Sequence, residues 1–144
     1  MSPTLASRSE LSSELRIGVM RLARRLRSQR ADHGLTLGQV SVLAALDRHG
    51  PLSPGEVAAH EGISPPSATR TIASLADLGL VTRTPHASDG RQLVIALTEG
   101  ARDLLHEDRR RRDAWLADAL EALSPHERAV LREAAPILDR LSGA

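Results

Sequence analysis

Apolar side chains recur three or four residues apart along most of the chain, which is the spacing of one face of an α-helix. The first such stretch predicts a long amphipathic helix over residues 7–30, with Ser7 and Glu10 as a capping box at its start. Its apolar positions are Leu11, Leu15, Gly18, Val19, Leu22 and Leu26. Arginines occupy the opposite side, so one face is suited to packing and the other to solvent.

Two shorter helices follow, and each opens with a residue that caps helices. Thr36, with Gln39 three residues on, begins the first of them. Its expected apolar contacts are Val40, Leu43, Ala44 and Leu46. Ser53-Pro54-Gly55-Glu56 then combines a capping serine, a proline at the first helical position and a closing glutamate. It predicts a short helix over 54–61 that ends at Gly62.

Another proline-led helix start comes directly after Gly62. Ser64 is followed by two prolines, which predicts a helix over 65–78 with Gly79 as its candidate C-cap. The inward positions of this helix are Ala68, Ile72, Leu75 and Leu78. Two helices, 54–61 and 65–78, joined by a tight turn that contains glycine form a helix-turn-helix pattern.

The segments "LVTRT" (80–84) and "QLVIAL" (92–97) are rich in Val, Ile and Thr, as strands are. Between them lies Asp89-Gly90, and Asp-Gly is among the strongest short hairpin signals. A hairpin that directly follows a helix-turn-helix makes a winged helix. We therefore predict a mainly α fold with a small β-hairpin wing, flanked by further helices on both sides.

Thr98 is expected to cap a long helix over 99–122. Its middle, "HEDRRRRD" (106–113), contains no apolar residue. A helix that is polar all round bridges packed regions through solvent, so the start should pack on the winged helix and the end elsewhere. Arg109 and Asp113 are four residues apart, which is a helical pairing distance. We interpret the arginine run 109–112 as a solvated face rather than a nucleic-acid contact.

Ser124-Pro125-His126-Glu127 opens a last helix with the same cap chemistry as Ser53. Its apolar positions are Val130, Leu131, Ala134, Ile137, Leu138 and Leu141. Pro136 should kink or split this helix. Trp115 is the only residue of the Phe, Tyr and Trp type. We expect its side chain either in the core of a bundle of terminal helices or in one wall of an effector pocket.

Composition narrows the class of protein. With 41% apolar residues and almost no aromatics, the core must be built from Leu, Val, Ile and Ala, which suits packed helices. The absence of cysteine excludes thiol catalysis, disulfides and cysteine zinc sites. No apolar run approaches the length of a membrane span, and "MSPTLASRSE" lacks a signal-peptide core. We expect a cytoplasmic protein.

The overall charge does not by itself indicate nucleic acid, because the formal net charge is only +1. All nineteen basic residues are arginine, the side chain better suited to bidentate contacts with phosphate and guanine. Residues 62–98 hold three Arg against two Asp, whereas residues 1–35 hold seven Arg against three acidic residues. The first helix is therefore a second candidate source of DNA affinity.

The exposed start of the helix behind Ser64 is the candidate DNA-reading surface. Small side chains let a helix enter the major groove, and its N-terminal N–H groups favour phosphate. Arg70 is the residue there that can bind guanine O6 and N7 together. The candidate residues are Ser64, Pro66, Ser67, Thr69, Arg70 and Thr71.

The hairpin adds three further candidates. Arginine is the side chain best suited to a narrow, negative minor groove, which makes Arg91 the main candidate of the wing. Asp89 could pair with Arg91 and hold it pointed, although turn chemistry alone explains Asp89 and Gly90. Arg83, near the end of the first strand, is equally well read as a phosphate contact or as a solvated charge.

With these elements in order, the chain resembles the MarR family of bacterial transcription regulators over nearly its whole length. The most specific matches are "LADLGLVTR" running into the wing, the Asp-x-Arg at Asp89 and Arg91, and "LTEGA" at the start of the long helix. The resemblance implies a homodimer with intertwined terminal helices. It divides the chain into an N-terminal dimerisation helix (5–35), a DNA-binding winged helix (36–98) and a bridging helix with a C-terminal dimerisation helix (99–144).

The resemblance also implies roles for the site. Arg91 would enter the minor groove, and Ser64 to Thr71 would read the major groove of double-stranded DNA at a pseudo-palindromic operator. A small-molecule effector of unknown identity would control a repressor. Peroxide-sensing members use a cysteine, which is absent here, and zinc-sensing members use clusters of His and acidic residues. The six histidines are scattered, so we expect no metal and no cofactor.

Two other classes of function are compatible with parts of this sequence. A winged-helix module that binds a protein instead of DNA is the main alternative, and the low net charge favours it slightly. An enzyme is the weakest reading. No nucleophile–base set, phosphate-binding glycine loop or paired carboxylates can be found, and capping explains the serines at helix starts.

Overall fold

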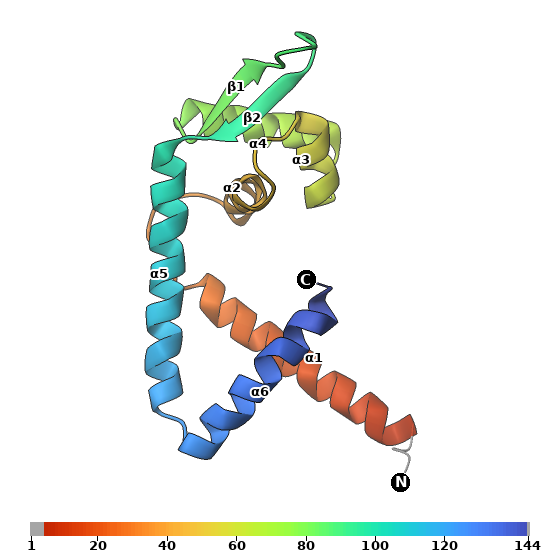
Figure 1. Cartoon of the computed structure of the whole chain (residues 1–144), viewed down its shortest axis with the longest axis vertical. Helices are drawn as coiled ribbons and strands as arrows, with labels where there is room; N and C mark the ends of the chain where they lie inside the picture. The colour runs from red at the N-terminus through yellow and green to blue at the C-terminus, as the bar shows by residue number, and fades with distance from the viewer. Residues whose placement is uncertain (1–4, 144) are drawn as a thin grey trace. The chain divides into compact units, whose positions relative to one another are not determined.

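The computed structural model describes residues 5–143 and confirms a mainly helical chain with one antiparallel hairpin (Figure 1). The elements in order are α1 (Leu5–Arg27), α2 (Leu37–His49), α3 (Pro54–Glu61), α4 (Pro65–Asp77), β1 (Val81–Pro85), β2 (Leu93–Leu97), α5 (Glu99–Glu121) and α6 (Pro125–Ser142). The chain divides into two compact units. Residues 31–109 form the winged-helix unit, and the residues up to 30 together with those from 110 on form the terminal-helix unit. The division falls inside α5.

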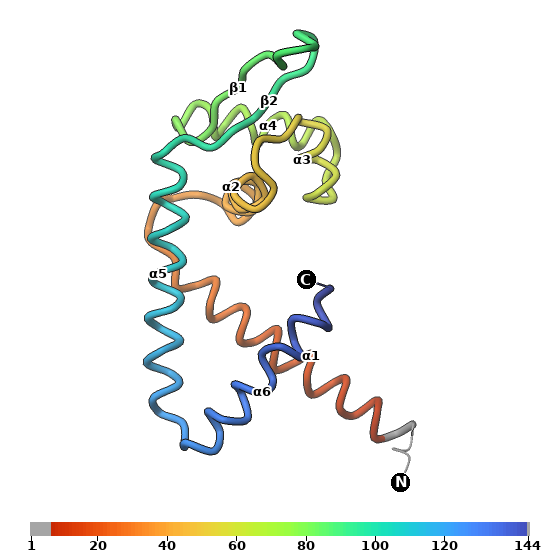
Figure 2. The backbone as a smooth tube through the Cα atoms, in the orientation of Figure 1, coloured from red at the N-terminus to blue at the C-terminus, as the bar shows by residue number. Residues whose placement is uncertain are grey.

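The core of the winged-helix unit lies among α2, α3, α4, the hairpin and the start of α5. The largest fully buried apolar side chains are Val42, Leu43, Val57, Leu75 and Ile95. Figure 2 shows the backbone passing from β2 straight into α5. Because Ala101 and Leu105 belong to the same core, the start of α5 packs on the winged helix, as the apolar pattern predicts.

Short-range caps define the starts of α2, α3, α4 and α6 as expected. Thr36 with Gln39 and Ser53 with Glu56 form complete capping boxes, in which each pair exchanges side-chain and backbone hydrogen bonds. The pKa of Glu56 lies below its ordinary value because its carboxylate accepts the backbone N–H of Ser53, and the Ser53 hydroxyl adds to the effect. Ser64 and Ser124 cap α4 and α6 through their hydroxyl oxygens.

The turn after α4 also follows the predicted chemistry. Gly79 adopts a left-handed backbone, with φ of 73°. The N–H of Leu80 donates to the carbonyl of Leu75 at 2.9 Å, and the N–H of Gly79 donates to Ala76 at 3.0 Å. These two bonds satisfy carbonyls that the end of a helix leaves free. The turn delivers the chain directly into β1.

The two strands pair over five positions, from Val81 with Leu97 to Pro85 with Leu93. The segment between α2 and α3 adds a single bridge to this sheet. Leu52 and Ile95 exchange both backbone hydrogen bonds, at 3.0 and 2.7 Å. This bridge, which the sequence pattern did not reveal, fixes the base of the hairpin to the helical core.

The terminal-helix unit contains α1, the end of α5 and α6. Arg25 of α1 lies over the Trp115 ring of α5, with its Cζ atom 5.4 Å from the ring centroid. A groove of about 400 Å³ is lined by apolar side chains from all three helices and by two arginines of α6. Its lining residues are Leu22, Leu116, Leu120, Arg128, Leu131, Arg132 and Ala135. No residue of α6 within the described chain is buried.

Three sequence predictions about helices are wrong. Ser7 lies inside α1, so it does not cap this helix. Ala44 and Leu78 were expected to face inward but are exposed, whereas Val42 and Ala45 of α2 are buried. Helix α2 is apolar over much of its surface, and only its packing partners decide which side is covered. Of the two outcomes expected at Pro136, splitting does not occur, because α6 is a single helix from Pro125 to Ser142, and a kink stays a prediction.

Candidate nucleic-acid interface

The candidate recognition surface is the N-terminal half of α4. Ala68, Ile72 and Leu75 are buried in the winged-helix core, which anchors the inner side of this helix. The outer side presents the polar residues that the sequence singled out. Ser64, Pro66, Thr69 and Arg70 are exposed, and Ser67 and Thr71 are half-buried. All six candidates therefore lie on one helix end, and each retains exposed surface.

A chain of hydrogen bonds runs along the start of this helix. The hydroxyl of Ser64 accepts the backbone N–H of Ser67 at 3.3 Å and donates to the Ser67 hydroxyl at 2.9 Å. The guanidinium of Arg70 donates from Nη2 to the same Ser67 oxygen at 3.3 Å. Ser67 therefore restrains Arg70, whose guanidinium is the strongest hydrogen-bond donor on this surface.

Gln39 of α2, which the sequence pattern predicts only as part of a capping box, also contacts the recognition helix α4. Gln39 closes the capping box of α2, and its Nε2 also donates to the Ser74 hydroxyl of α4 at 3.1 Å. Ser74 in turn donates to the carbonyl of Thr71 at 2.7 Å. A glutamine at the third helical position indicates a capping box, but no local signal reveals its second partner 35 residues away.

The wing loop lies between Pro85 and Leu93, and its geometry differs from the two-residue turn that Asp-Gly favours. Gly90 has no left-handed backbone, and the N–H of Gln92 donates to the carbonyl of Asp89 at 3.0 Å. The Asp89 carboxylate accepts the backbone N–H of Arg91 at 3.1 Å. The expected pairing with the Arg91 guanidinium is therefore replaced by a turn bond, which leaves that side chain exposed.

His86 organises the same loop, although no sequence motif points to it. Its Nδ1 atom accepts the backbone N–H groups of Ser88 at 3.1 Å and Asp89 at 3.3 Å. This places an acceptor at the inner side of the loop and assigns the ring proton of the neutral form to Nε2. A lone histidine beside a turn carries no signal that distinguishes this role from a solvated surface residue.

Arg83 lies in β1 opposite Ile95, and its side chain is exposed. Thr98 connects the wing to the helices at the other end of the hairpin. Its hydroxyl oxygen accepts the N–H of Ala101 at 3.3 Å, as expected for the cap of α5. The same hydroxyl donates to the carbonyl of Gly79 at 2.8 Å. One side chain therefore ties the start of α5 to the turn after the recognition helix.

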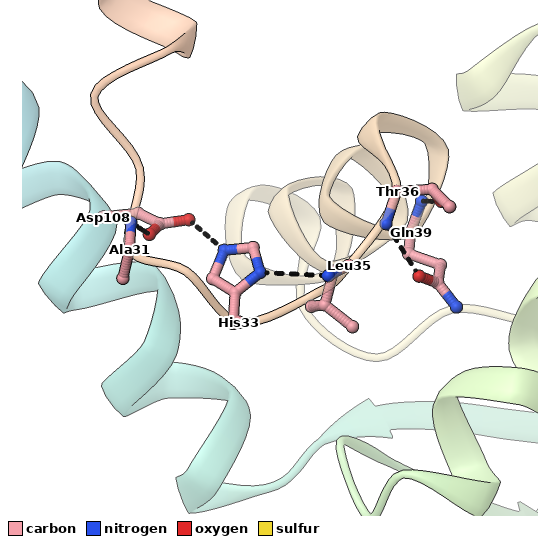
Figure 3. A network of polar contacts seen from close by, with 6 residues as sticks. All are labelled: Ala31, His33, Leu35, Thr36, Gln39 and Asp108. Carbon is pink, nitrogen blue, oxygen red and sulfur yellow. Dashed lines mark hydrogen bonds and ion pairs between the residues drawn. The ribbon is translucent and has the colours of Figure 1, made fainter.

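A buried polar cluster joins the segment before α2 to α5. The expectation that 106–113 bridges through solvent is wrong at Asp108, which is only 1% exposed. In the arginine run 109–112, Arg109, Arg110 and Arg111 are exposed as expected, and Arg112 is half-buried. The Oδ1 atom of Asp108 accepts the N–H of Ala31 at 2.8 Å, and its Oδ2 atom lies 2.9 Å from Nε2 of His33 (Figure 3). Arg109 pairs with Asp47 of α2 at 3.2 Å, not with Asp113. These partners are distant in sequence, so helical spacing alone cannot predict them.

This architecture can be compared with known proteins. The sequence model of the MarR family matches residues 33–92, which span the helix-turn-helix and most of the wing. The chain is 43% identical over 134 residues to the uncharacterized HTH-type transcriptional regulator Mb0904 of Mycobacterium bovis, covering 93% of this chain and 94% of that protein.

The chain belongs to the MarR family. The fold agrees with solved structures of similar length. RV1404 from Mycobacterium tuberculosis is 27% identical, with a TM-score of 0.84 over 95% of both chains. A MarR family protein from Bacillus stearothermophilus has the same fold, with a TM-score of 0.82 at 23% identity, over 99% of this chain and all of that one.

Membership of the MarR family makes the protein a transcriptional regulator with a DNA-binding winged helix, and not an enzyme. Within the described residues, no helix has the length and apolar character needed to cross a bilayer.

Proposed function

We propose that the protein is a homodimeric repressor that binds a pseudo-palindromic operator in a sequence-specific manner. The observation that carries the proposal is the two-sided character of α4. Its inner residues, such as Ala68 and Ile72, are fully packed, whereas Thr69 and Arg70 are exposed on the other side. A rigidly anchored helix with small and cationic outer residues is suited to the major groove, where its first residues contact base edges.

The wing extends this surface. Arg91 would insert into the minor groove beside the site that α4 reads, since a narrow groove concentrates negative potential that attracts arginine. Asp89 supports this role indirectly, because it fixes the backbone at Arg91 and leaves the guanidinium available. Arg83 would contact a phosphate. The alternative for Arg83, a solvated charge, predicts no effect on DNA affinity when it is removed.

A second copy of the chain would cover the terminal helices. The large apolar side chains of α6 are exposed, from 41% at Leu138 to 71% at Leu141. Helix α1 likewise exposes Leu11, Leu15, Val19 and Leu22. An amphipathic helix is stabilised chiefly by packing of its apolar face, so these faces require a partner. We assign residues 5–35 and 99–144 to the dimer and 36–98 to DNA binding.

A two-fold axis between the copies would place the two recognition helices on successive half-sites, about 34–36 Å apart. Repression is supported by a Bacillus subtilis relative, the HTH-type transcriptional repressor MdtR, which is 26% identical over 144 residues. The fold also occurs in Bordetella bronchiseptica BpsR, whose DNA binding is regulated by 6-hydroxynicotinic acid. An effector of this chain would bind more tightly to a dimer whose two recognition helices have a spacing that does not match the half-sites, and it would thereby lower the affinity for DNA. As a regulator of transcription, the protein would act in the cytoplasm.

The direct test is a DNA titration at several salt concentrations. A duplex that carries the promoter region of the protein's own gene is titrated at 50 to 200 mM salt and followed by fluorescence anisotropy. Phosphate neutralisation predicts that affinity falls steeply and linearly on a log–log plot. Sedimentation of the complex should give two protein chains per duplex. Absence of binding at 50 mM salt would favour a protein partner instead of DNA.

A further inference from the structure

The hydroxyl groups of the recognition helix donate mostly to the helix itself. The Thr69 hydroxyl donates to the carbonyl of Pro65 at 3.0 Å, and the Thr71 hydroxyl donates to the carbonyl of Ser67 at 3.0 Å. The Ser64 hydroxyl donates to Ser67, and the Ser74 hydroxyl donates to Thr71. A hydroxyl has one proton to donate, so four of these side chains have used their only donor.

Thr69 differs from the other hydroxyl residues in its exposure. Thr71 and Ser74 are half-buried, whereas Thr69 is exposed on the outer side of α4, next to Arg70. The bond to the carbonyl four residues earlier holds the Thr69 oxygen against the preceding helical turn. With its only proton used, the side chain can meet a ligand through its γ-methyl carbon or through a free lone pair of the oxygen. Thr69 can therefore act as an apolar group at a position whose residue type suggests a polar contact.

We propose that Thr69 reads a thymine in each half-site, by contact of its γ-methyl group with the 5-methyl group of the base. The inference rests on the proposed function, because it requires α4 to lie in the major groove. Thymine is the base that presents a methyl group there, and threonine methyl groups are among its known apolar partners. Arg70 would then supply the polar contact to guanine, and Thr69 the apolar contact in the same half-site.

The alternative is that the Thr69 oxygen accepts a hydrogen bond from an exocyclic amine of adenine or cytosine through a free lone pair. The methyl contact and the hydroxyl contact require different atoms of the Thr69 side chain, so two substitutions distinguish them. A methyl contact survives Thr69→Val, which keeps the branched shape, and is lost in Thr69→Ser, which keeps the hydroxyl. A hydroxyl contact shows the reverse pattern. Thr82→Ser makes the same chemical change at an exposed residue of β1 that is not among the proposed DNA-reading residues, and it is the matched control.

The experiment begins with a duplex selected by the wild-type protein from a pool of randomised DNA. Each thymine of the selected half-site is replaced, in both half-sites, by deoxyuridine, which removes only the 5-methyl group. Dissociation constants are measured for the wild-type protein and the three variants. We expect one position at which deoxyuridine weakens wild-type binding about fourfold per half-site, the equivalent of about 0.8 kcal/mol for one buried methylene.

At that position, Thr69→Val and Thr82→Ser should respond to deoxyuridine as the wild-type protein does, whereas Thr69→Ser should bind thymine and deoxyuridine equally. Equal sensitivity in Thr69→Ser, or no thymine position that depends on its methyl group, would overturn this inference and leave DNA reading by α4 intact. Failure to select any sequence from the pool would overturn both this inference and the proposed function. The base substitution requires no protein variant, so the central result does not depend on folding of a mutant.

Discussion

The carboxylate of Asp108 and the imidazole of His33 lie 2.9 Å apart in a buried cluster that joins the segment before α2 to α5. The N–H of Leu35 donates to Nδ1 of His33 at 3.2 Å, which assigns the ring proton to Nε2, opposite the Asp108 carboxylate. The other carboxylate oxygen accepts from Ala31. The buried carboxylate thus satisfies two donors from a stretch of chain that has no secondary structure of its own.

Replacing Asp108 by Asn should destabilise the protein more than its small change in shape suggests. The amide has one acceptor oxygen for two donors, so either Ala31 or His33 loses its partner, at a cost of about 1–3 kcal/mol. The free energy of unfolding can be measured in urea at one fixed protein concentration. Asp113→Asn, which alters an exposed carboxylate of the same helix, is the matched control. Equal stability of the two variants would show that the cluster contributes no net stability.

Arg91→Ala should weaken binding to all DNA sequences by a similar factor, because a minor-groove arginine neutralises the phosphates beside it. The log–log salt dependence should become shallower by about one unit for each half-site. Arg102→Ala removes an exposed arginine of the same unit that already pairs with Glu99 and should leave the slope unchanged. Unchanged affinity of Arg91→Ala at physiological salt would exclude Arg91 as a DNA contact.

Arg70→Ala should relax base preference at one position per half-site, with a loss of discrimination of about 1–3 kcal/mol. Arg70→Lys tests the geometry of this contact, since lysine keeps the charge but cannot form the same bidentate bonds. It should retain most non-specific affinity and lose the preference for guanine. Binding to a panel of duplexes with single base changes measures both effects. A uniform loss over the panel would make Arg70 a phosphate contact instead.

Leu131→Glu should dissociate the proposed dimer, because this exposed leucine lines the apolar groove of the terminal-helix unit. Each copy would bury a carboxylate in place of an apolar side chain, which is expected to raise the dimer dissociation constant by about 100-fold or more. Sedimentation velocity over a range of concentrations reports the change. Glu133→Gln alters an exposed polar residue of the same helix and should remain dimeric. A dimer of unaltered affinity in Leu131→Glu would place the interface on another surface.

The capping box of α3 should make stability depend on pH. The pKa of Glu56 is lower in the folded protein than its ordinary value, so its contribution to stability is complete at pH 7 and is lost as pH falls through the lowered pKa. Wild-type protein should therefore lose more stability between pH 7 and pH 3 than Glu56→Gln does. Urea unfolding at both pH values measures the difference. Glu121→Gln should follow the wild-type protein, and identical curves for Glu56→Gln would exclude the linkage.

Local features of this chain could be read from the sequence with good accuracy. The capping boxes at Thr36 and Ser53, the cap at Ser64 and the left-handed Gly79 all appear as predicted. The helix over 54–61 has the predicted limits. These features depend on interactions between residues at most five positions apart, so the sequence states them almost directly. The six candidates on α4 follow from the same local signals and remain together in the fold.

Features that depend on distant partners could not be obtained in this way. Spacing paired Arg109 with Asp113, but in the fold it meets Asp47. Asp108 looked like one charge in a solvated run, yet its partners lie 75 and 77 residues away. The sequence alone determined the elements and the family resemblance; tertiary structure decided which polar groups are buried or satisfied, because burial is set by contacts between segments far apart along the chain.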